Sequence, residues 1–162
     1  MAFTSRLRAI WDAPPLADAR AALTARDGET IDMQIAISEI AAPTGEETER
    51  GEWVASRFRA LGLTDVRNDA AGNVIGTRAG AEDVAPVVIC AHLDTVFPRG
   101  VPLRVQRDGT RLVGPGIGDN GRGLAAMLAL AGVIDGVALR TRAPVVFAAT
   151  TGEEGSGDLR GA

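Results

Sequence analysis

The 162-residue sequence contains no lysine and no tyrosine, and it has one cysteine, Cys90, and one histidine, His92. The absence of lysine excludes Schiff-base chemistry and the phosphate-binding lysine of a P-loop. A single cysteine excludes an intramolecular disulfide bond. Because Cys90 lies within the apolar run 87–91, we expect a buried, unreactive thiol.

Strong charge of one sign and long hydrophobic runs are also missing. The chain has 17 basic and 21 acidic residues and a net charge of −4. A nucleic-acid surface requires clustered positive charge, so we expect no nucleic-acid partner. No apolar run approaches the roughly 20 residues of a membrane helix, and the first 13 residues lack the apolar segment of a secretory signal. We therefore expect a cytoplasmic protein without a membrane partner.

The composition is that of a globular domain, with 46% apolar residues. A chain of this size buries roughly 68–70% of its unfolded surface, enough for one core. Helical patterns occupy the first 62 residues, in segments 14–28, 30–41 and 44–61. Thr44 and Glu47 have the spacing of a capping box, which predicts that the third helix begins at Thr44.

After residue 62 the pattern changes to short strands. The apolar runs 86–91 and 143–150 are rich in β-branched residues, which predicts strands buried on both faces. An apolar helix at 124–134 lies between them, so the two strands and the helix form a βαβ unit. Hairpins are predicted at 64–78 and 103–113. The expected fold is α/β, a three-layer sandwich of a mixed, mostly parallel sheet with helices on both faces.

Polar residues follow the first buried strand. His92 and Asp94 are two residues apart, so in an extended chain both side chains point to the same side. An imidazole beside a carboxylate that orients it suits a metal site. By itself the pair is a weak signal, and a strand end followed by a turn is the more common interpretation.

Asp119 lies in the glycine-rich segment 114–123, directly before the apolar helix. It could serve as the N-cap of that helix. Gly116, Gly118 and Gly121 also match the dinucleotide-binding pattern G-x-G-x-x-G. That pattern requires a buried strand immediately before it, and a carboxylate in the loop would repel a pyrophosphate. A nucleotide-dependent oxidoreductase is therefore a minor alternative.

Glu153 and Glu154 follow the second buried strand. Adjacent carboxylates repel each other unless a positive charge or solvent compensates, and a solvated turn is one interpretation. In an extended conformation they point in different directions, so one could bind a metal while the other transfers a proton. Together, His92, Asp119 and Glu154 form a set of nitrogen and oxygen ligands suited to zinc or a similar ion.

Three ordered segments, 92–96, 114–120 and 153–155, resemble a known family. It is the group of co-catalytic zinc hydrolases that includes aminoacylase, acetylornithine deacetylase, succinyl-diaminopimelate desuccinylase, carboxypeptidase G and peptidase T. The resemblance extends to residues 42–46 and 71–74. It implies a zinc metallopeptidase or amidohydrolase that cleaves amide bonds in small peptides or N-acyl amino acids. The glycine-rich segment is most similar to carboxypeptidase G and peptidase T.

The resemblance also implies a role for each candidate residue. His92 would bind one metal, Asp119 would bridge two metals, and Glu154 would bind the second. Glu153 would be the general base that takes a proton from water, and Asp94 would orient the site without binding metal. The cofactor would be two zinc ions, with cobalt or manganese as alternatives. The Asp119–Asn120 peptide bond would be cis.

The family also uses a further acidic ligand and a distant histidine. Here His92 is the only histidine, and Asp158 is the only carboxylate after Glu154. We therefore expect residues 1–162 to be the N-terminal part of a catalytic domain, with a helical lead-in at 1–62 and the sheet and metal-site segments at 63–162. The lid and dimerisation domain would be absent, the parent protein could be a homodimer, and this chain alone would be inactive. The alternative is a truncated, non-catalytic metal-binding or structural module.

Overall fold

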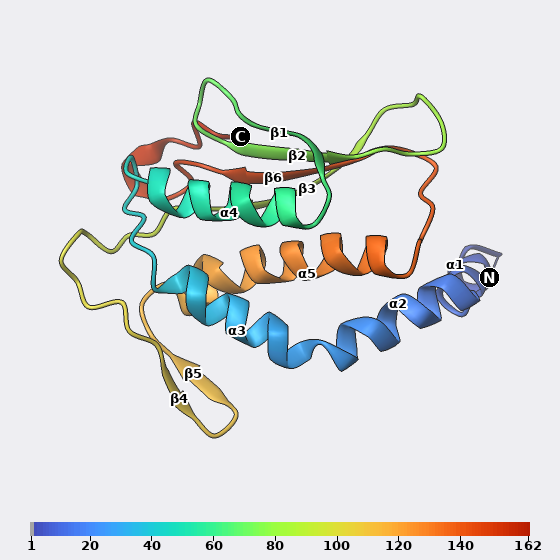
Figure 1. The fold of residues 1–162 in the computed structure, drawn as a ribbon, viewed down its shortest axis with the longest axis horizontal. Coiled ribbons are helices and arrows are strands. Elements are labelled where there is room, and N and C mark those ends of the chain that lie inside the picture. The colour runs from blue at the N-terminus through green and yellow to red at the C-terminus, as the bar shows by residue number, and fades with distance from the viewer. Residues whose placement is uncertain (1) are drawn as a thin grey trace.

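The computed structural model describes residues 2–162, and four helices precede its sheet (Figure 1). They are α1 (Ala2–Trp11), α2 (Pro14–Ala25), α3 (Asp27–Ser38) and α4 (Thr48–Ala60). Pro14 begins α2, where its missing N–H costs nothing because the first N–H groups of a helix have no partner within it. Helix α2 ends before Arg26 and α3 begins after it, so Gly28 lies inside α3 and does not end the preceding helix.

The start of α4 differs from the sequence prediction. The helix begins at Thr48, with Glu47 as N-cap and without a side-chain cap. The Thr44 hydroxyl donates instead to Asp94 at 3.0 Å, and the Glu47 carboxylate accepts from Gly45 N at 2.9 Å. The predicted capping box is therefore wrong, because both side chains have tertiary or loop partners that replace the cap.

The main sheet has four strands in the order β1-β2-β6-β3. The strands are β1 (Thr64–Asn68), β2 (Val74–Arg78), β3 (Val87–His92) and β6 (Val145–Thr150). Strands β3 and β6 are parallel and are joined through α5 (Gly123–Gly136), which confirms the βαβ unit and the mixed α/β sheet.

The other two strand pairings, β1–β2 and β2–β6, are antiparallel, so the expected mostly parallel sheet is wrong for the described residues. The turn between β1 and β2 is too short for a crossover, and a short turn joins only antiparallel neighbours. Helices α4 and α5 lie on one face of this sheet (Figure 1). Within residues 2–162 no helix covers the other face, so the expected second helical layer is not found there.

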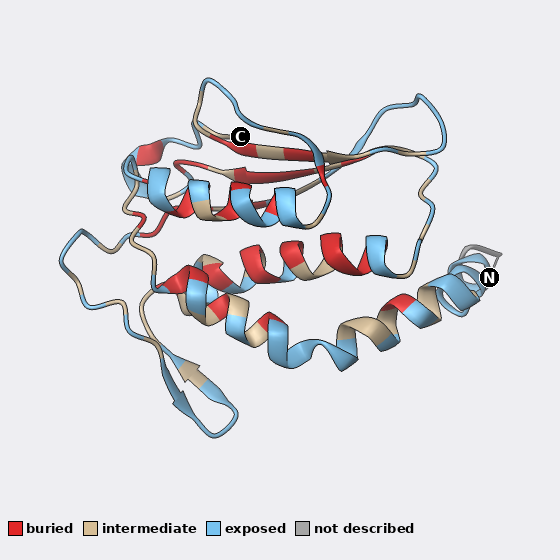
Figure 2. Ribbon diagram, in the orientation of Figure 1, coloured by how far each residue is buried: buried red, intermediate tan, exposed pale blue. Residues whose placement is uncertain are grey.

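Strand β3 is more exposed than the sequence predicted. It forms one edge of the sheet, and Val87 and Val88 are 54% and 59% exposed. Cys90 is also exposed, contrary to the prediction of a buried thiol. Strand β6 is paired on both sides and is mostly buried, as predicted (Figure 2). The two strands have similar apolar sequences, so their different burial follows from their places in the sheet.

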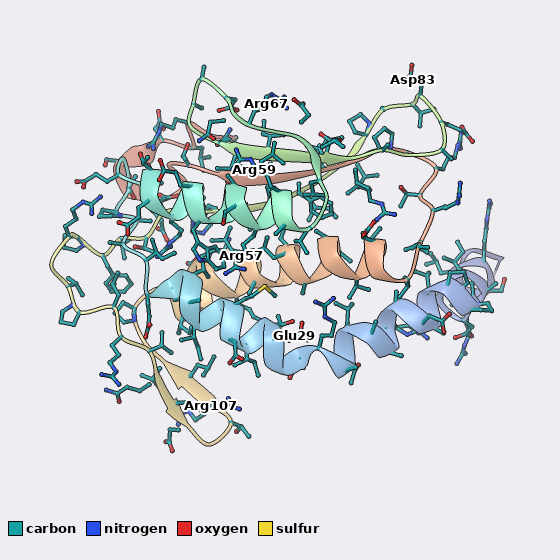
Figure 3. All side chains as sticks on the ribbon, in the orientation of Figure 1. Glu29, Arg57, Arg59, Arg67, Asp83 and Arg107 are labelled. Atoms are coloured by element: carbon teal, nitrogen blue, oxygen red, sulfur yellow. The ribbon has the colours of Figure 1, made fainter. Side chains whose placement is uncertain are left out.

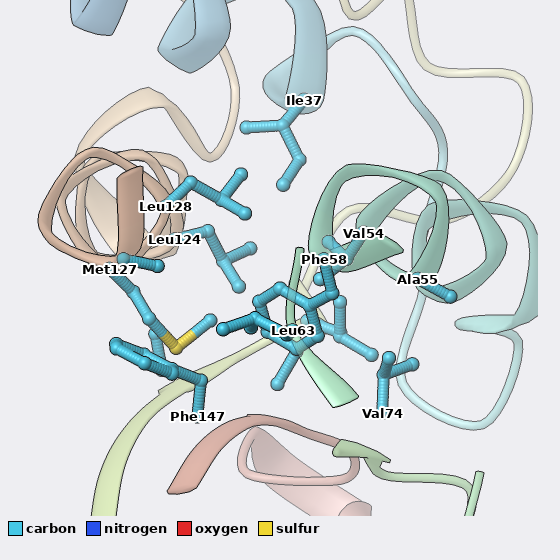
Figure 4. Close-up of a cluster of buried hydrophobic side chains, with 14 of the residues drawn as sticks. Ile37, Val54, Ala55, Phe58, Leu63, Val74, Leu124, Met127, Leu128 and Phe147 are labelled. Carbon is cyan, nitrogen blue, oxygen red and sulfur yellow. The ribbon is translucent and has the colours of Figure 1, made fainter. Parts of the chain in front are cut away.

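The core fills the space between the sheet and helices α3, α4 and α5 (Figure 4). Phe58 of α4 and Phe147 of β6 are fully buried, and their ring centroids are 6.4 Å apart. Aromatic pairs at this distance stabilise a core beyond the area that they bury. Other large side chains of this core include Ile37, Val54, Leu63, Val74, Leu93, Leu124, Met127 and Leu128.

A two-stranded hairpin projects away from the main sheet. It consists of β4 (Gln106–Asp108) and β5 (Arg111–Val113), as the sequence predicted, and Figure 3 labels Arg107 on it. Two short segments complete the fold: Ile117–Arg122, which is kinked at Asp119 and Asn120, and a short helical turn at Gly155–Gly157. None of the described helices has the length and apolar character needed to cross a bilayer.

The turn between β1 and β2 allows a stability prediction. Asp69 accepts hydrogen bonds from Ala71 N at 2.9 Å, Asn73 N at 3.0 Å and the Asn73 amide at 2.9 Å. Burial tends to raise the pKa of Asp69, but these bonds outweigh it and hold the pKa below its ordinary value. Asp69→Ala should lower the free energy of unfolding at pH 7 by about 1 kcal/mol.

The same contribution should depend on pH in one direction. A depressed folded pKa stabilises fully above the unfolded value, about 3.9, and the effect is lost as the pH falls through the folded pKa. Urea unfolding at pH 7 and near pH 2 measures this, with Asp83→Ala in an exposed loop as the control. Equal losses for Asp69→Ala at both pH values would contradict the prediction.

Candidate metal centre

Four of the candidate residues meet at the carboxyl end of the parallel pair β3 and β6. His92 is the last residue of β3, and Glu153 and Glu154 lie three and four residues after the end of β6 at Thr150. Asp119 lies in the turn before α5, the helix that connects the two strands. Parallel strands end at the same edge of a sheet, so the βαβ connection brings these residues together.

The distances among these side chains are short. His92 Nε2 lies 2.9 Å from Asp119 Oδ1 and 3.9 Å from Glu153 Oε2. One ligand atom each of His92, Glu153 and Glu154 lies within 4.8 Å of the other two. The His92 side chain is 10% exposed, whereas those of Glu153 and Asp119 are 49% and 78% exposed. The cluster is therefore open to a ligand on its carboxylate side.

Asp94, which follows β3, is hydrogen-bonded to the backbone that follows β6. It is fully buried and accepts from Glu153 N at 3.0 Å, Glu154 N at 2.8 Å and the Thr44 hydroxyl at 3.0 Å. His92 Nδ1 lies 3.1 Å from the Asp94 carbonyl oxygen and 3.5 Å from its carboxylate. These contacts hold the imidazole so that Nε2 faces the other carboxylates, the arrangement that metal-binding histidines commonly use.

The pKa shifts indicate how charge is balanced. Burial alone would raise the pKa of Asp94, but the bonds from Glu154 N, Glu153 N and Thr44 outweigh it and lower the pKa, so Asp94 is ionised. The pKa of Glu154 is raised, first by burial and then by the negative charges of Asp119 and Glu153. A cation among these carboxylates would relieve that repulsion. Their donor atoms, an imidazole nitrogen and carboxylate oxygens, fit a divalent ion.

The turn that carries Asp119 is held from two sides. The Asp119–Asn120 peptide bond is cis, as the resemblance implied. The Asn120 side chain accepts from Gly123 N at 3.1 Å, so Asn120 rather than Asp119 caps the start of α5. On the other side, the Gln34 amide of α3 donates to the Ile117 carbonyl at 2.7 Å. Asp119 is therefore left to face His92.

The glycine pattern at 116–121 lacks the context of a dinucleotide site. Strand β5, which precedes it, belongs to the separate two-stranded hairpin and not to the main sheet. The loop also places the Asp119 carboxylate where a pyrophosphate would have to lie near the helix. The oxidoreductase alternative therefore finds no support in the fold.

Sequence reasoning missed two buried charged residues of α4 and its N-cap, Arg50 and Glu47. Arg50 is 1% exposed and donates to the Ile40 and Leu93 carbonyls, at 2.5 and 2.6 Å. Burial lowers its pKa to about 10, against the opposing influence of the Asp94 charge. No local signal marks Arg50, because a charged residue near a helix start normally faces solvent.

Comparison with known proteins identifies the family. The sequence profile of peptidase family M28 matches residues 73–162, more than half of the chain. The chain belongs to peptidase family M28. A Thermococcus kodakarensis protein named as a LysW-lysine/LysW-ornithine hydrolase is 32% identical over 127 residues, which are 78% of this chain and 33% of that protein.

Solved structures of peptidases share the fold. A Staphylococcus aureus tripeptidase superposes with a TM-score of 0.63 at 28% identity, over 76% of this chain and 36% of its own. A dinuclear metal-binding peptidase of the M20 family from Bacillus subtilis shares the fold, with a TM-score of 0.57 at 16% identity, over 82% and 36% of the two chains. The resemblance to co-catalytic metallopeptidases and amidohydrolases is thus confirmed. The M28 chain described here spans about a third of the length of these relatives.

Proposed function

We propose that this M28 chain supplies the metal-binding part of an enzyme that hydrolyses amide bonds in small peptides or N-acyl amino acids. The observation that carries the proposal is the convergence of His92, Glu153 and Glu154 within 4.8 Å, with Asp119 2.9 Å from His92. We assign metal binding to His92, Asp119 and Glu154, and we propose two zinc ions as the cofactor. Cobalt and manganese suit the same oxygen-rich donor set.

The remaining residues of the site receive different roles. A bound divalent cation lowers the pKa of water and polarises a carbonyl oxygen. Glu153 is half exposed at the open side of the cluster, so its carboxylate can reach solvent and act as general base. Asp94 is buried beneath His92 and orients the imidazole through Nδ1. Asp94 therefore acts through His92 and not on the substrate.

The other proposals concern the whole protein. Residues 1–162 would form the first part of a catalytic domain, with the helical segment 1–62 leading into the sheet and site segments 63–162. Specificity contacts and a dimer interface would come from parts of the relatives that this chain does not span. The proposed location is cytoplasmic, and the proposed specificity is that of a carboxypeptidase, an aminopeptidase or a deacylase.

The role of Glu153 can be separated from that of a metal ligand by Glu153→Gln. The variant should bind Co²⁺ within about threefold of the wild-type affinity, whereas Glu154→Ala should lose roughly tenfold or more. The measurement is titration of the metal-free chain with Co²⁺, followed by its visible absorption. In a longer protein that contains this segment, Glu153→Gln should lower kcat by about 10²–10⁴-fold.

Two results would change the proposal. A loss of Co²⁺ affinity in Glu153→Gln as large as that in Glu154→Ala would make Glu153 a ligand and not the base. Absence of saturable Co²⁺ binding by the wild-type chain would contradict the metal site. We expect the 162-residue chain alone to show no hydrolysis of dipeptides or N-acetyl amino acids. Turnover that disappears in Glu153→Gln would contradict that expectation.

A further inference from the structure

The carboxylate of Glu47 contacts the backbone next to Glu153 and accepts four hydrogen bonds. Oε1 accepts from Gly45 N at 2.9 Å and from Gly152 N at 3.1 Å. The Arg160 guanidinium donates from Nη2 to both oxygens at 2.7 Å. The Glu47 side chain is 5% exposed and that of Arg160 is 37% exposed. This ion pair therefore joins the start of α4 to a segment more than 100 residues later.

Both ends of the segment 152–160 form hydrogen bonds with the Glu47 carboxylate. Gly152 donates through its backbone, and Arg160 donates through its side chain. Glu153 and Glu154 lie directly after the first attachment point. The backbone N–H groups of Glu153 and Glu154 donate to a different buried carboxylate, that of Asp94. The backbone that carries both site glutamates is thus held between two buried carboxylates.

Further contacts close the base of this loop. Gly161 N donates to the Thr151 carbonyl at 3.0 Å. The Asn73 side chain accepts from Thr151 N at 2.9 Å and donates to the Gly161 carbonyl at 2.9 Å. The loop therefore returns to the end of β6, which brings Arg160 beside Glu47.

The fit around Gly152 is close. The backbone angle φ of Gly152 is +65°, a value that residues other than glycine rarely adopt. A Cβ atom at this position would lie 2.5 Å from Arg160 Nη1. A Cβ on Gly157 would lie 2.5 Å from Gly152 Cα. The guanidinium thus packs directly against the backbone that precedes the two glutamates, so a displacement of Arg160 would move that backbone.

We propose that Glu47 and Arg160 are positioning residues that fix the segment 152–160 so that Glu153 and Glu154 face His92. The inference rests on the proposed function, since it takes these glutamates to form a metal site. Like-charged side chains that must converge tend to separate when the metal is absent, so a fixed backbone reduces the cost of bringing them together. The pair touches neither the metal nor the substrate and acts only through the loop.

The test uses Glu47→Gln and Arg160→Met in the 162-residue chain, with Co²⁺ as the probe. Glutamine keeps an oxygen for Gly152 N but loses the charge that pairs with Arg160. Each variant should raise the Co²⁺ dissociation constant by about tenfold and change the visible absorption of the bound ion, as loss of a group that orients ligands does. The double variant should lose no more Co²⁺ affinity than the single variant with the larger loss, because the two residues act as one unit.

Two controls separate positioning from general stability. Glu82 and Arg142 form an exposed ion pair at 2.8 Å, so Glu82→Gln and Arg142→Met should leave Co²⁺ affinity and absorption unchanged. Arg160→Lys keeps the charge and should recover part of the affinity lost in Arg160→Met. Circular dichroism of the metal-free variants reports whether they are folded. If Glu47→Gln does not fold, the test uses Arg160→Met and Arg160→Lys. The Arg160 side chain is partly exposed, so these substitutions disturb folding less than a change at the buried Glu47.

The possible failures are distinguishable. If the wild-type chain binds no Co²⁺, the metal site itself is wrong, and the positioning role falls with it. If the wild-type chain binds Co²⁺ and folded Arg160→Met binds it with the same affinity and absorption, only the positioning role is wrong. An equal affinity loss in Arg142→Met would also overturn it, because the effect would then not be specific to this loop.

Discussion

Replacement of Asp119 by alanine is expected to weaken Co²⁺ binding by at least about 100-fold, the upper end of what loss of a group that merely orients a ligand costs. Asp119 is the carboxylate nearest to His92 Nε2, at 2.9 Å, and the family resemblance implies that it would bind both metals. Its removal should therefore affect both ions. No other substitution of a single carboxylate in this chain should reduce affinity as much.

The same substitution should leave the metal-free fold nearly unchanged. The Asp119 side chain is 78% exposed, and the cap of α5 is made by Asn120. Removal of one negative charge also lessens the repulsion that raises the pKa of Glu154. Thermal unfolding without metal, followed by circular dichroism, should give a transition within a few degrees of the wild type.

The control for Asp119→Ala is Asp158→Asn, which changes an exposed carboxylate in the loop after Glu154. It should retain the wild-type Co²⁺ affinity. An affinity of Asp119→Ala equal to that of the wild type would show that Asp119 is not a ligand. A loss in Asp158→Asn as large as that in Asp119→Ala would point to a nonspecific effect of negative charge.

Arg50→Met is expected to lower the free energy of unfolding by about 3–5 kcal/mol, the usual cost of removing one member of a buried charged arrangement. The guanidinium donates to the carbonyls of Ile40 and Leu93, and its charge lies near that of Asp94. Methionine fills part of the volume but donates no hydrogen bond. The buried Leu93 carbonyl and the part-buried Ile40 carbonyl would lose their charged donor, and the Asp94 carboxylate would lose the nearby positive charge.

Urea unfolding of the metal-free chain measures this loss. Arg59→Met is a matched control on the same helix, because Arg59 is exposed (Figure 3). It should change the free energy of unfolding by no more than about 0.5 kcal/mol. Similar losses in Arg50→Met and Arg59→Met would show that the buried guanidinium contributes little to the fold.

The strands show how far local sequence determines burial. The run 143–150 predicted a buried strand, and β6 is buried because it has neighbours on both sides. The run 86–91 has the same character and gave the same prediction, yet β3 lies at the edge with Val88 exposed. Apolar residues specify that a segment is a strand, but its neighbours in the sheet decide whether it is buried.

The start of α4 shows a different limit. Thr44 and Glu47 have the spacing of a capping box, but each finds partners elsewhere in the fold. A cap is worth about 1 kcal/mol, whereas a buried carboxylate that lacks its donors costs more. The Thr44 hydroxyl therefore donates to Asp94, and the Glu47 carboxylate accepts from Gly45 N, Gly152 N and Arg160, so neither side chain is left to cap the helix.

The α/β class, the βαβ unit and the grouping of His92, Asp119, Glu153 and Glu154 could all be predicted from local sequence patterns. These follow from periodicity and from the rule that parallel strands end at one edge of a sheet. The strand order, the sheet face that no helix of residues 2–162 covers, and the buried contacts of Arg50 and Glu47 arise only when the whole chain packs. Such contacts join residues up to 113 positions apart, and no local pattern encodes a partner at that separation because the packing of the whole chain creates the contact.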